Sequence, residues 1–235
     1  MLYKNIIRPI LFRLTREDPE VAHEEVIKLL RAIGESKHVY RMLKKYATVN
    51  DPRLSQDVFG LEFKNPVGLA AGFDKNGDVI DGLSALGFGF IEVGTITPYY
   101  QEGNNRPRMF RLTKDEALIN RMGFNNIGAD NVVRSNLVLR KKKESLLGIS
   151  IGKSKTTPLE KAADDYVDLL KKLYGFGDYF AINTSPAVFE TLNIPAVNLG
   201  ELQNQVGETV AGRTGCAVSL IRGPGSQSPR TWRSC

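Results

Sequence analysis

Cysteine, histidine and tryptophan are scarce in this sequence. Its 235 residues include two cysteines, two histidines and one tryptophan. Both cysteines, Cys216 and Cys235, lie near the C-terminus, so they provide neither a disulfide framework nor a metal-ligand spacing. His23 and His38 flank a predicted helix and are not expected to be ligands. We therefore predict that the protein holds no metal.

Long apolar runs are also missing. No run reaches the roughly 18 residues that a helix needs to cross a bilayer, and the N-terminus lacks the apolar core and cleavage site of a signal peptide. The net charge of +6 suits an anionic partner. Basic and acidic residues are nevertheless interleaved, and no nucleic-acid-binding motif is present. The basic run at 141–143 fits a solvated helix end, so we expect no nucleic acid as a partner.

Residues 1–48 are predicted to form helices ahead of the main domain. Asp18 fits an N-cap, Pro19 the first helical position and Gly34 the end of that helix. A shorter apolar and basic stretch, residues 1–14, precedes it. Two interpretations stay open. The helices either form a packed N-terminal cap, or they anchor the protein at a membrane surface, where apolar residues enter the headgroup region and basic residues meet anionic lipid.

Residues 49–184 alternate between strand and helix patterns. Four apolar stretches are expected to be strands, at 66–71, 90–95, 146–152 and 178–183. A capping box of Thr157 and Glu160, with Pro158 between them, is expected to open the helix before the last strand. Apolar strands separated by helices indicate a parallel α/β sheet. Such a sheet belongs either to a (β/α) barrel or to a doubly wound fold.

The composition changes after Asn183. No lysine follows Lys172 and no acidic residue follows Glu208, while glycine, serine, proline and arginine dominate the end. Residues 185–235 are therefore expected to be a divergent, poorly ordered tail rather than another strand–helix unit. Because a complete barrel has eight strands and typically about 250 residues, only about the first half of a barrel is expected.

Small and polar residues follow the predicted strands. Ala71 and Gly72 end the first strand and would let a flat ligand approach the backbone closely. Lys75 follows with a positive charge, and Gly94 and Thr95 end the second strand. In a barrel this end of the strands forms the active site. The pattern therefore predicts a surface for a flat ligand with a cation beside it.

The stretch LINRMGFNN, residues 118–126, contains three asparagines, an arginine and a glycine. Its carboxamides offer donors and acceptors for a planar, polar anion, with Asn120 and Asn125 as candidate ligands. The alternative is an asparagine-rich turn in which the amides cap the backbone. Taken alone, the residues leave both interpretations open.

Taken in order, seven stretches resemble the dihydroorotate dehydrogenase family, and specifically its membrane-associated class 2 branch. They are DPEVAHE (18–24), FKNPVGLAAGFDKNG (63–77), GFGFIEVGTITP (87–98), NRPRMFRL (105–112), INRMGFNN (119–126), GISIGKSKTTP (148–158) and DYFAIN (178–183). GLAAGFDK and INRMGFNN together are specific to the family, and the DPEVAHE helix favours class 2. The resemblance runs almost continuously from Met1 to Asn183.

The resemblance implies an α/β fold, a (β/α)8 TIM barrel with an N-terminal helical extension, of which about the first half is present. It implies FMN as cofactor and dihydroorotate as substrate. A proton would leave C5 of dihydroorotate and a hydride would pass from C6 to FMN, giving orotate, with ubiquinone or menaquinone as the final acceptor in de novo pyrimidine biosynthesis. The N-terminal helices would form the quinone access and rest on the cytoplasmic side of a bacterial cell membrane.

The resemblance also implies roles for individual residues. Those that would contact FMN are Ala71, Gly72, Phe73, Asp74, Lys75, Thr95, Ser150 and Asn183. Those that would contact dihydroorotate or orotate are Lys75, Asn120, Arg121, Met122, Gly123, Phe124 and Asn183. Lys75 would pair with the pyrimidine carboxylate.

Three departures from the family limit these expectations. Ser150 stands where the family has an asparagine, and Ala187 where it has a substrate-binding asparagine. Ser185 is the candidate catalytic base, but it stands one residue early, and such a slip along a strand moves a hydroxyl by about 3.3 Å. The family's later site residues are not recognisable after Asn183, which indicates a truncated or frame-shifted gene. The alternative function is therefore a non-catalytic remnant that associates with a membrane or with itself and binds no FMN.

Overall fold

Helices form the N-terminal part of the computed structural model, which describes residues 3–15, 18–58, 60–137, 144–184, 217–221 and 232–234. They are η1 (Tyr3–Ile7), α1 (Arg8–Leu14), α2 (Pro19–Glu35) and α3 (Lys37–Ala47). The predicted N-cap is confirmed, because the Asp18 carboxylate accepts hydrogen bonds from the N–H groups of Glu20 and Val21 at 2.8 and 3.1 Å. No helix among the described residues is both long and apolar enough to cross a bilayer.

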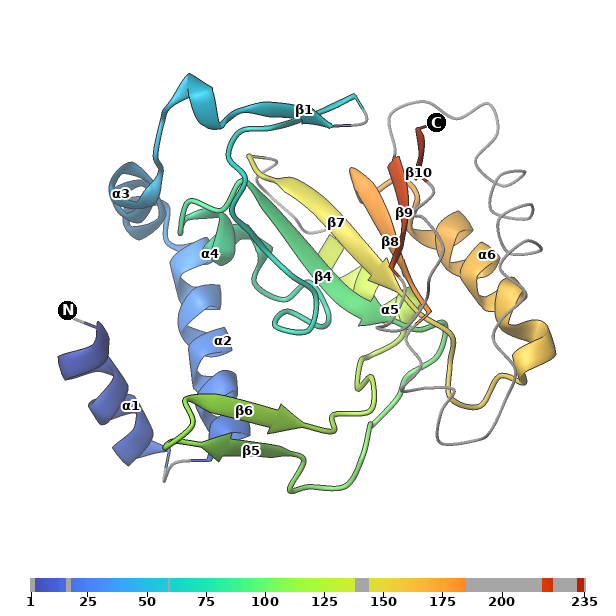
Figure 1. Ribbon diagram of the computed structural model, residues 1–235, viewed down its shortest axis with the longest axis horizontal. Coiled ribbons are helices and arrows are strands. Elements are labelled where there is room, and N and C mark those ends of the chain that lie inside the picture. Colours follow the sequence, from blue (N-terminus) through green and yellow to red (C-terminus); the bar gives the residue numbers. More distant parts are fainter. Residues whose placement is uncertain are drawn as a thin grey trace.

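The main sheet has the strand order β10-β9-β8-β7-β4-β3 (Figure 1). Its strands are β3 (Gly68–Leu69), β4 (Phe90–Ile96), β7 (Leu146–Ile151), β8 (Tyr179–Asn183), β9 (Ala217–Ile221) and β10 (Trp232–Ser234). The strands from β3 to β9 are parallel, and β10 is antiparallel to β9. Neighbouring parallel strands follow one another along the chain, as in a (β/α) barrel, whereas a doubly wound sheet reverses its order at a switch point. The sheet is therefore part of a barrel.

Helices and two short hairpins fill the connections between the strands. The helices are α4 (Ile80–Ser84), α5 (Ala129–Val132), η3 (Val133–Leu137), η4 (Leu159–Lys161) and α6 (Ala162–Leu173). After η2 (Pro52–Leu54), the antiparallel strands β1 (Gln56–Val58) and β2 (Leu61–Phe63) precede β3. The second hairpin consists of β5 (Met109–Leu112) and β6 (Ala117–Asn120). It is part of the connection between β4 and α5. Figure 1 shows it beside the first turn of α2, apart from the main sheet.

Side chains alternate between two environments along the parallel strands. Ile149 and Ile151 of β7 are fully buried and belong to one core cluster with Tyr166 and Leu170 of α6. Ser150 lies between the two isoleucines and points to the opposite face, since strand side chains alternate. The same alternation that builds the core therefore turns a polar residue toward the barrel interior.

The structure departs from the sequence prediction in two places. In this described part of the chain the capping box is not formed: the Thr157 N–H donates to the Ser154 carbonyl at 3.2 Å, and neither η4 nor α6 has a side-chain cap. The segment 185–235, expected to be a divergent tail, contains the strand β9 at 217–221, which pairs in parallel along β8. Its sequence AVSLI is apolar and partly β-branched, which suits a strand. The basic run at 141–143 lies outside the described residues.

Helix α2 crosses α4 at a contact between two glycines. A Cβ on Gly82 would lie 2.1 Å from the Leu30 carbonyl oxygen, and a Cβ on Gly34 would lie 3.0 Å from the Gly82 nitrogen. Gly82 therefore has no room for a side chain. Leu30 and Leu83 are 4% and 2% exposed and join the buried core at this place. The close crossing thus fixes α2 against the barrel.

Replacing Gly82 with alanine should lower the free energy of unfolding by about 1–3 kcal/mol, because the added methyl group overpacks the crossing. Alanine is otherwise the better helix former by about 1 kcal/mol, so a loss of stability reports the crossing itself. Gly175→Ala is the matched control, since a Cβ at Gly175 meets no atom within 4 Å. Urea unfolding of both variants measures the effect. Equal stability of the two variants would contradict the prediction.

Candidate active site

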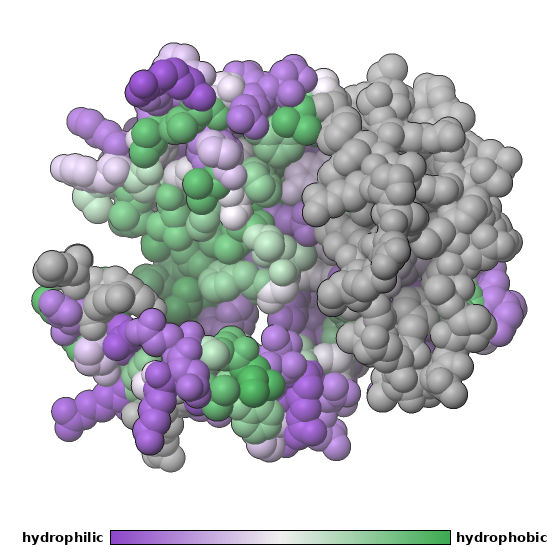
Figure 2. Space-filling view, in the orientation of Figure 1, coloured by the Kyte–Doolittle hydropathy of each residue, from purple (hydrophilic) through white to green (hydrophobic). Residues whose placement is uncertain are grey.

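The C-terminal ends of the parallel strands open into one cavity of about 1820 Å³. Helices α1 and α2 and the loop after β6 complete its walls, and Figure 2 shows a hollow above the β5–β6 hairpin with apolar residues on both sides. The predicted FMN contacts that line the cavity are Ala71, Gly72, Phe73, Lys75, Thr95, Ser150 and Asn183. The predicted substrate contacts that line it are Lys75, Asn120, Arg121, Met122, Gly123, Phe124 and Asn183. The structure therefore brings both predicted sets together.

Three polar side chains meet where β4, β7 and β8 end. The hydroxyl oxygens of Thr95 and Ser150 are 2.9 Å apart, and the Asn183 amide donates to the Thr95 hydroxyl at 3.1 Å. The Tyr166 hydroxyl of α6 donates to the Asn183 backbone carbonyl at 3.0 Å and holds the end of β8 in place. Thr95 and Ser150 are 8% and 1% exposed. Hydrogen bonds within the protein therefore hold the cluster in place, and its three residues line the cavity.

The turn after β3 presents bare backbone to the cavity. The Gly72 N–H donates to the Gly94 carbonyl and the Gly94 N–H donates to the Asp74 carbonyl, both at 2.9 Å, so the turn is attached to β4. Gly72 has a φ of +108°, and a Cβ there would meet no atom within 4 Å. A flat ligand can therefore approach this backbone without meeting a side chain.

Lys75 supplies a positive charge at the same turn. Its ammonium donates to the Gly72 carbonyl at 2.8 Å. Burial lowers the pKa of Lys75 below its ordinary value, and the positive charge of Arg108 lowers this pKa further, while Glu20 raises it. Because the ammonium is partly shielded from water, its attraction to a bound anion is stronger than that of an exposed lysine.

The loop after β6 is held by its backbone, which leaves side chains for the cavity. The Asn104 N–H and amide donate to the carbonyls of Met122 and Arg121 at 3.0 and 2.7 Å. Asn120 and Asn125 line the cavity, and the buried Asn125 amide oxygen has no hydrogen-bond partner among the described residues. An unpaired buried acceptor is costly unless a ligand satisfies it. These two asparagines therefore have the arrangement expected of ligands.

Asn126, in the same stretch, has the backbone-capping role that was the alternative to ligand binding. It is 4% exposed, its amide donates to the Thr97 hydroxyl at 2.9 Å, and its oxygen accepts from the Gly128 N–H at 2.9 Å. Asn126 therefore caps backbone, as a turn asparagine does.

The structure places Asp74 away from the cavity. Ser185, the candidate base, lies outside the described residues. The resemblance placed Asp74 among the residues that would contact FMN, but Asp74 does not line the cavity and is 1% exposed. Its carboxylate accepts from the N–H groups of Asp78 and Val79 at 2.8 and 2.9 Å. Burial raises the pKa of Asp74 to about 6. The residue stabilises the chain leading into α4, so its side chain is structural.

Lys153 and Glu92 are among the charged residues that line the cavity without having been predicted. Lys153 is 8% exposed, and its ammonium donates to the carbonyls of Ser154 and Thr157 at 2.7 and 2.6 Å. Its position just after a strand, like that of Lys75, was the available signal. Glu92 accepts from the Tyr179 hydroxyl at 3.2 Å, and burial raises the pKa of Glu92. No local pattern marks Glu92.

The cavity continues from the strand ends to the N-terminal helices. Its lining there includes Arg8, Leu11, Phe12, Ala22, His23, Val26 and Arg111. The Arg111 guanidinium carbon lies 3.9 Å from the centre of the Phe12 ring, a cation–π contact between β5 and α1. The His23 ring packs edge-on against Phe73 at 4.9 Å, and burial lowers the pKa of His23, with Lys75 lowering it further. This half of the cavity is therefore lined by apolar side chains with two arginines among them, and the lowered pKa of His23 favours its uncharged form.

Comparison with known proteins identifies relatives of the whole arrangement. A dihydroorotate dehydrogenase from Eimeria tenella, solved in complex with ferulenol, superposes with a TM-score of 0.65 and 38% identity, covering 86% of this chain and 54% of that one. A Chloroflexus aurantiacus protein named dihydroorotate dehydrogenase (quinone) is 50% identical over 185 residues, which are 79% of this chain and 51% of that protein. A Methylococcus capsulatus protein of the same name is 48% identical over 188 residues, 79% and 52% of the two chains.

The chain spans about half the length of the curated relatives it matches. The family model for dihydroorotate dehydrogenase matches residues 53–213. This match covers the turn with Lys75, the loop after β6 and the polar ends of β4, β7 and β8, and it continues beyond Asn183. The chain therefore belongs to the dihydroorotate dehydrogenase family.

Proposed function

We propose that the cavity binds FMN and a pyrimidine carboxylate, and that the chain takes part in the oxidation of dihydroorotate to orotate with a quinone as acceptor, in pyrimidine biosynthesis. The observation that carries the proposal is the convergence of Lys75, the loop after β6 and the polar strand ends on one cavity. The relatives named dihydroorotate dehydrogenase (quinone) support it. The rival proposal, a non-catalytic remnant without FMN, predicts that these groups bind nothing.

The residues at the strand ends fit FMN. Bare backbone at Gly72 suits a flat ring system, and hydroxyl and amide groups of Thr95, Ser150 and Asn183 suit its polar edge. When bound, FMN supplies an acceptor for a hydride. The protein's part is to hold the ring and exclude water, and the buried cluster of Thr95 and Ser150 provides a rigid support for it.

The other wall fits the pyrimidine. The ammonium of Lys75 would pair with the carboxylate, and the amide oxygen of Asn125 would accept from a ring N–H. Asn120 lines the same wall. Orientation by fixed groups of this kind lowers the barrier of a reaction between two bound partners. Ser185 remains the candidate base for the C5 proton.

The N-terminal helices would receive the quinone at a membrane surface. The side chains of Ile6, Ile10 and Leu14 are 52%, 55% and 76% exposed, although all three are aliphatic. Arg8 and Arg13 lie among them in the sequence. An apolar surface with adjacent arginines suits the headgroup region of an anionic bilayer. We propose that this surface rests on the cytoplasmic side of a cell membrane and that the apolar half of the cavity is the quinone access.

Gly72→Ala should weaken FMN binding by at least about tenfold, because its methyl group would occupy the space of the flat ring. Gly60→Ala is the matched control. Gly60 also has a positive φ, +75°, and a Cβ there also meets no atom within 4 Å, so both variants place an alanine at a positive φ in open space. Quenching of FMN fluorescence on titration with protein measures the affinity. If the parent chain takes up no FMN, the remnant is the correct interpretation.

Lys75→Met should weaken orotate binding to the FMN-loaded protein by about 10- to 100-fold, the value of a hydrogen bond to a charged group. Lys114→Met, at an exposed turn, is the control. In the parent, orotate affinity should fall as pH rises through the pKa of Lys75, which burial places below the ordinary 10.5, because the ammonium is then lost. Flavin absorbance changes on orotate addition measure both effects. A Lys75→Met protein with parental affinity and pH profile would contradict the assignment.

Ile10→Asp should reduce binding to vesicles of phosphatidylglycerol and phosphatidylcholine by about tenfold, because a charge replaces the apolar side chain that would enter the bilayer. Val67→Asp is the control, since Val67 is 63% exposed, precedes β3 and receives the same charge. Cosedimentation with the vesicles measures binding. Equal losses in the two variants would indicate a general charge effect instead of a membrane-binding surface on α1.

A further inference from the structure

We propose that Glu20 and Arg108 are positioning residues, whose ion pair connects α2 to the loop after β6 and thereby sets the affinity of the pyrimidine site. The proposal rests on the proposed function in one respect, namely that this loop binds the pyrimidine. It concerns two residues that lie outside the predicted contact sets, because neither Glu20 nor Arg108 lines the cavity.

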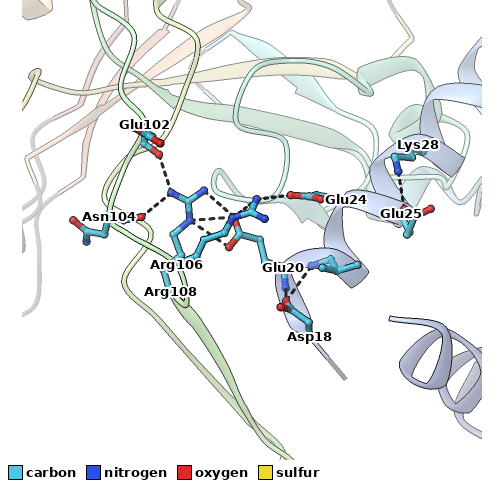
Figure 3. A network of polar contacts seen from close by, with 10 residues as sticks. Asp18, Glu20, Glu24, Glu25, Lys28, Glu102, Asn104, Arg106 and Arg108 are labelled. Carbon is cyan, nitrogen blue, oxygen red and sulfur yellow. Dashed lines mark hydrogen bonds and ion pairs between the residues drawn. The ribbon is translucent and has the colours of Figure 1, made fainter. Parts of the chain in front are cut away.

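The ion pair is buried between distant segments of the chain. Glu20 lies in the first turn of α2 and Arg108 directly precedes β5. Their side chains are 9% and 8% exposed, and the Arg108 Nη2 and Nε atoms donate to the Glu20 Oε1 atom at 2.7 and 3.0 Å. Figure 3 shows the two side chains facing each other from the helix and the strand. Removing Glu20 leaves the buried Arg108 guanidinium without its carboxylate, and removing Arg108 leaves Glu20 with the exposed Arg106 as its ion-pair partner. The pair therefore holds the two segments together.

The other side of the guanidinium is connected to the loop after β6 through Glu102 and Asn104. Arg108 Nη1 donates to the backbone carbonyls of Glu102 and Asn104 at 2.7 and 3.0 Å (Figure 3). Asn104 in turn donates to the carbonyls of Arg121 and Met122. The Arg121 N–H donates back to the Arg108 carbonyl at 2.9 Å. A continuous set of hydrogen bonds therefore leads from the Glu20 carboxylate to the loop that carries the ligand-facing asparagines.

A purely electrostatic effect and a positioning effect predict opposite changes in anion affinity when Glu20 is replaced. Arg108 lowers the pKa of Lys75 and Glu20 raises it, so both charges act on the ammonium that would pair with the pyrimidine carboxylate. If charge alone mattered, removal of the Glu20 carboxylate would favour an anion and removal of the Arg108 guanidinium would disfavour it. If the pair positions the loop, both removals weaken binding. Glu20→Ala therefore separates the two effects.

In the FMN-loaded full chain, we expect orotate to bind about tenfold more weakly to both Glu20→Ala and Arg108→Ala, because each breaks the buried pair. FMN affinity should stay unchanged, since the strand ends are not involved. Arg106→Ala is the matched control: Arg106 contacts Glu20 and Glu24 at 3.1 and 2.6 Å but is 57% exposed, and we expect less than about a twofold effect. Orotate titration followed by flavin absorbance measures the affinities. Tighter orotate binding by Glu20→Ala would overturn the inference.

Hydrogen exchange tests the positioning without any ligand. Amides of residues 118–126 should exchange about tenfold faster in Glu20→Ala and Arg108→Ala than in the parent or in Arg106→Ala, while those of β4 and β7 stay protected. Unchanged exchange in the loop would overturn the inference. A parent chain that binds no orotate would overturn the proposed function alone. If the alanine variants fail to fold, Glu20→Gln provides the same comparison, since it removes the charge and keeps the size of the side chain.

Discussion

The site depends on the parallel pairing of β4, β7 and β8, because parallel neighbours end at the same edge of a sheet. The register of β7 and β8 sets Ser150 opposite Ala181 and Ile151 opposite Ile182. In β4 the register shifts between Val93 and Ile96. Gly94 lies in this shift, and a Cβ there would be 2.4 Å from the Ser150 carbonyl oxygen. The absence of a side chain therefore allows β4 to approach β7 at the one point where both strands present hydroxyl groups.

The opposite wall of the cavity is built from contacts between segments that are far apart in sequence. At its start α2 carries Glu20, which binds Arg108 beside the hairpin. Further along, the Arg31 guanidinium of α2 contacts the Asp78 carboxylate at 2.8 Å, three residues after Lys75. The exposed Arg31 contact contributes little stability by itself. Together with the glycine crossing, however, these contacts attach one helix to both the turn that carries Lys75 and the loop after β6. Helix α2 therefore holds two walls of the cavity in place.

The sequence predicted those parts of the fold and site that local patterns determine. The Asp18 cap and the four strands depend on short stretches of residues, and the glycine and lysine of GFDK mark a strand end. Residue type alone left open whether the asparagines of residues 118–126 bind a ligand or cap a turn, because an amide has the same chemistry in both roles. The contact with Thr97 shows that Asn126 caps the turn. Asp74 was included among the FMN contacts because the family resemblance implies that residues 71–75 line FMN, whereas its carboxylate accepts from backbone N–H groups.

Long-range contacts account for what the sequence could not predict. Glu92 of β4 is held in place by the Tyr179 hydroxyl, which donates to its carboxylate from β8. Strand β7 lies between these two strands in the sheet, so no local sequence pattern indicates the contact. The Glu20–Arg108 pair joins residues 88 positions apart, and neither residue has a local signature. Burial of ionised groups depends on which segments the fold brings together, and this is a property of the tertiary structure rather than of any short pattern.

Ser150 shows how the site accommodates a departure from the family. A hydroxyl has one proton to donate, so Thr95 and Ser150 have two protons between them, and their contact at 2.9 Å uses one. The Asn183 amide acts as a donor to Thr95 and uses neither. One hydroxyl proton of the pair is thus left for another acceptor, and both residues line the cavity. The Thr95–Ser150 pair therefore keeps one hydroxyl proton that can be donated to a ligand in the cavity, whichever of the two residues carries it.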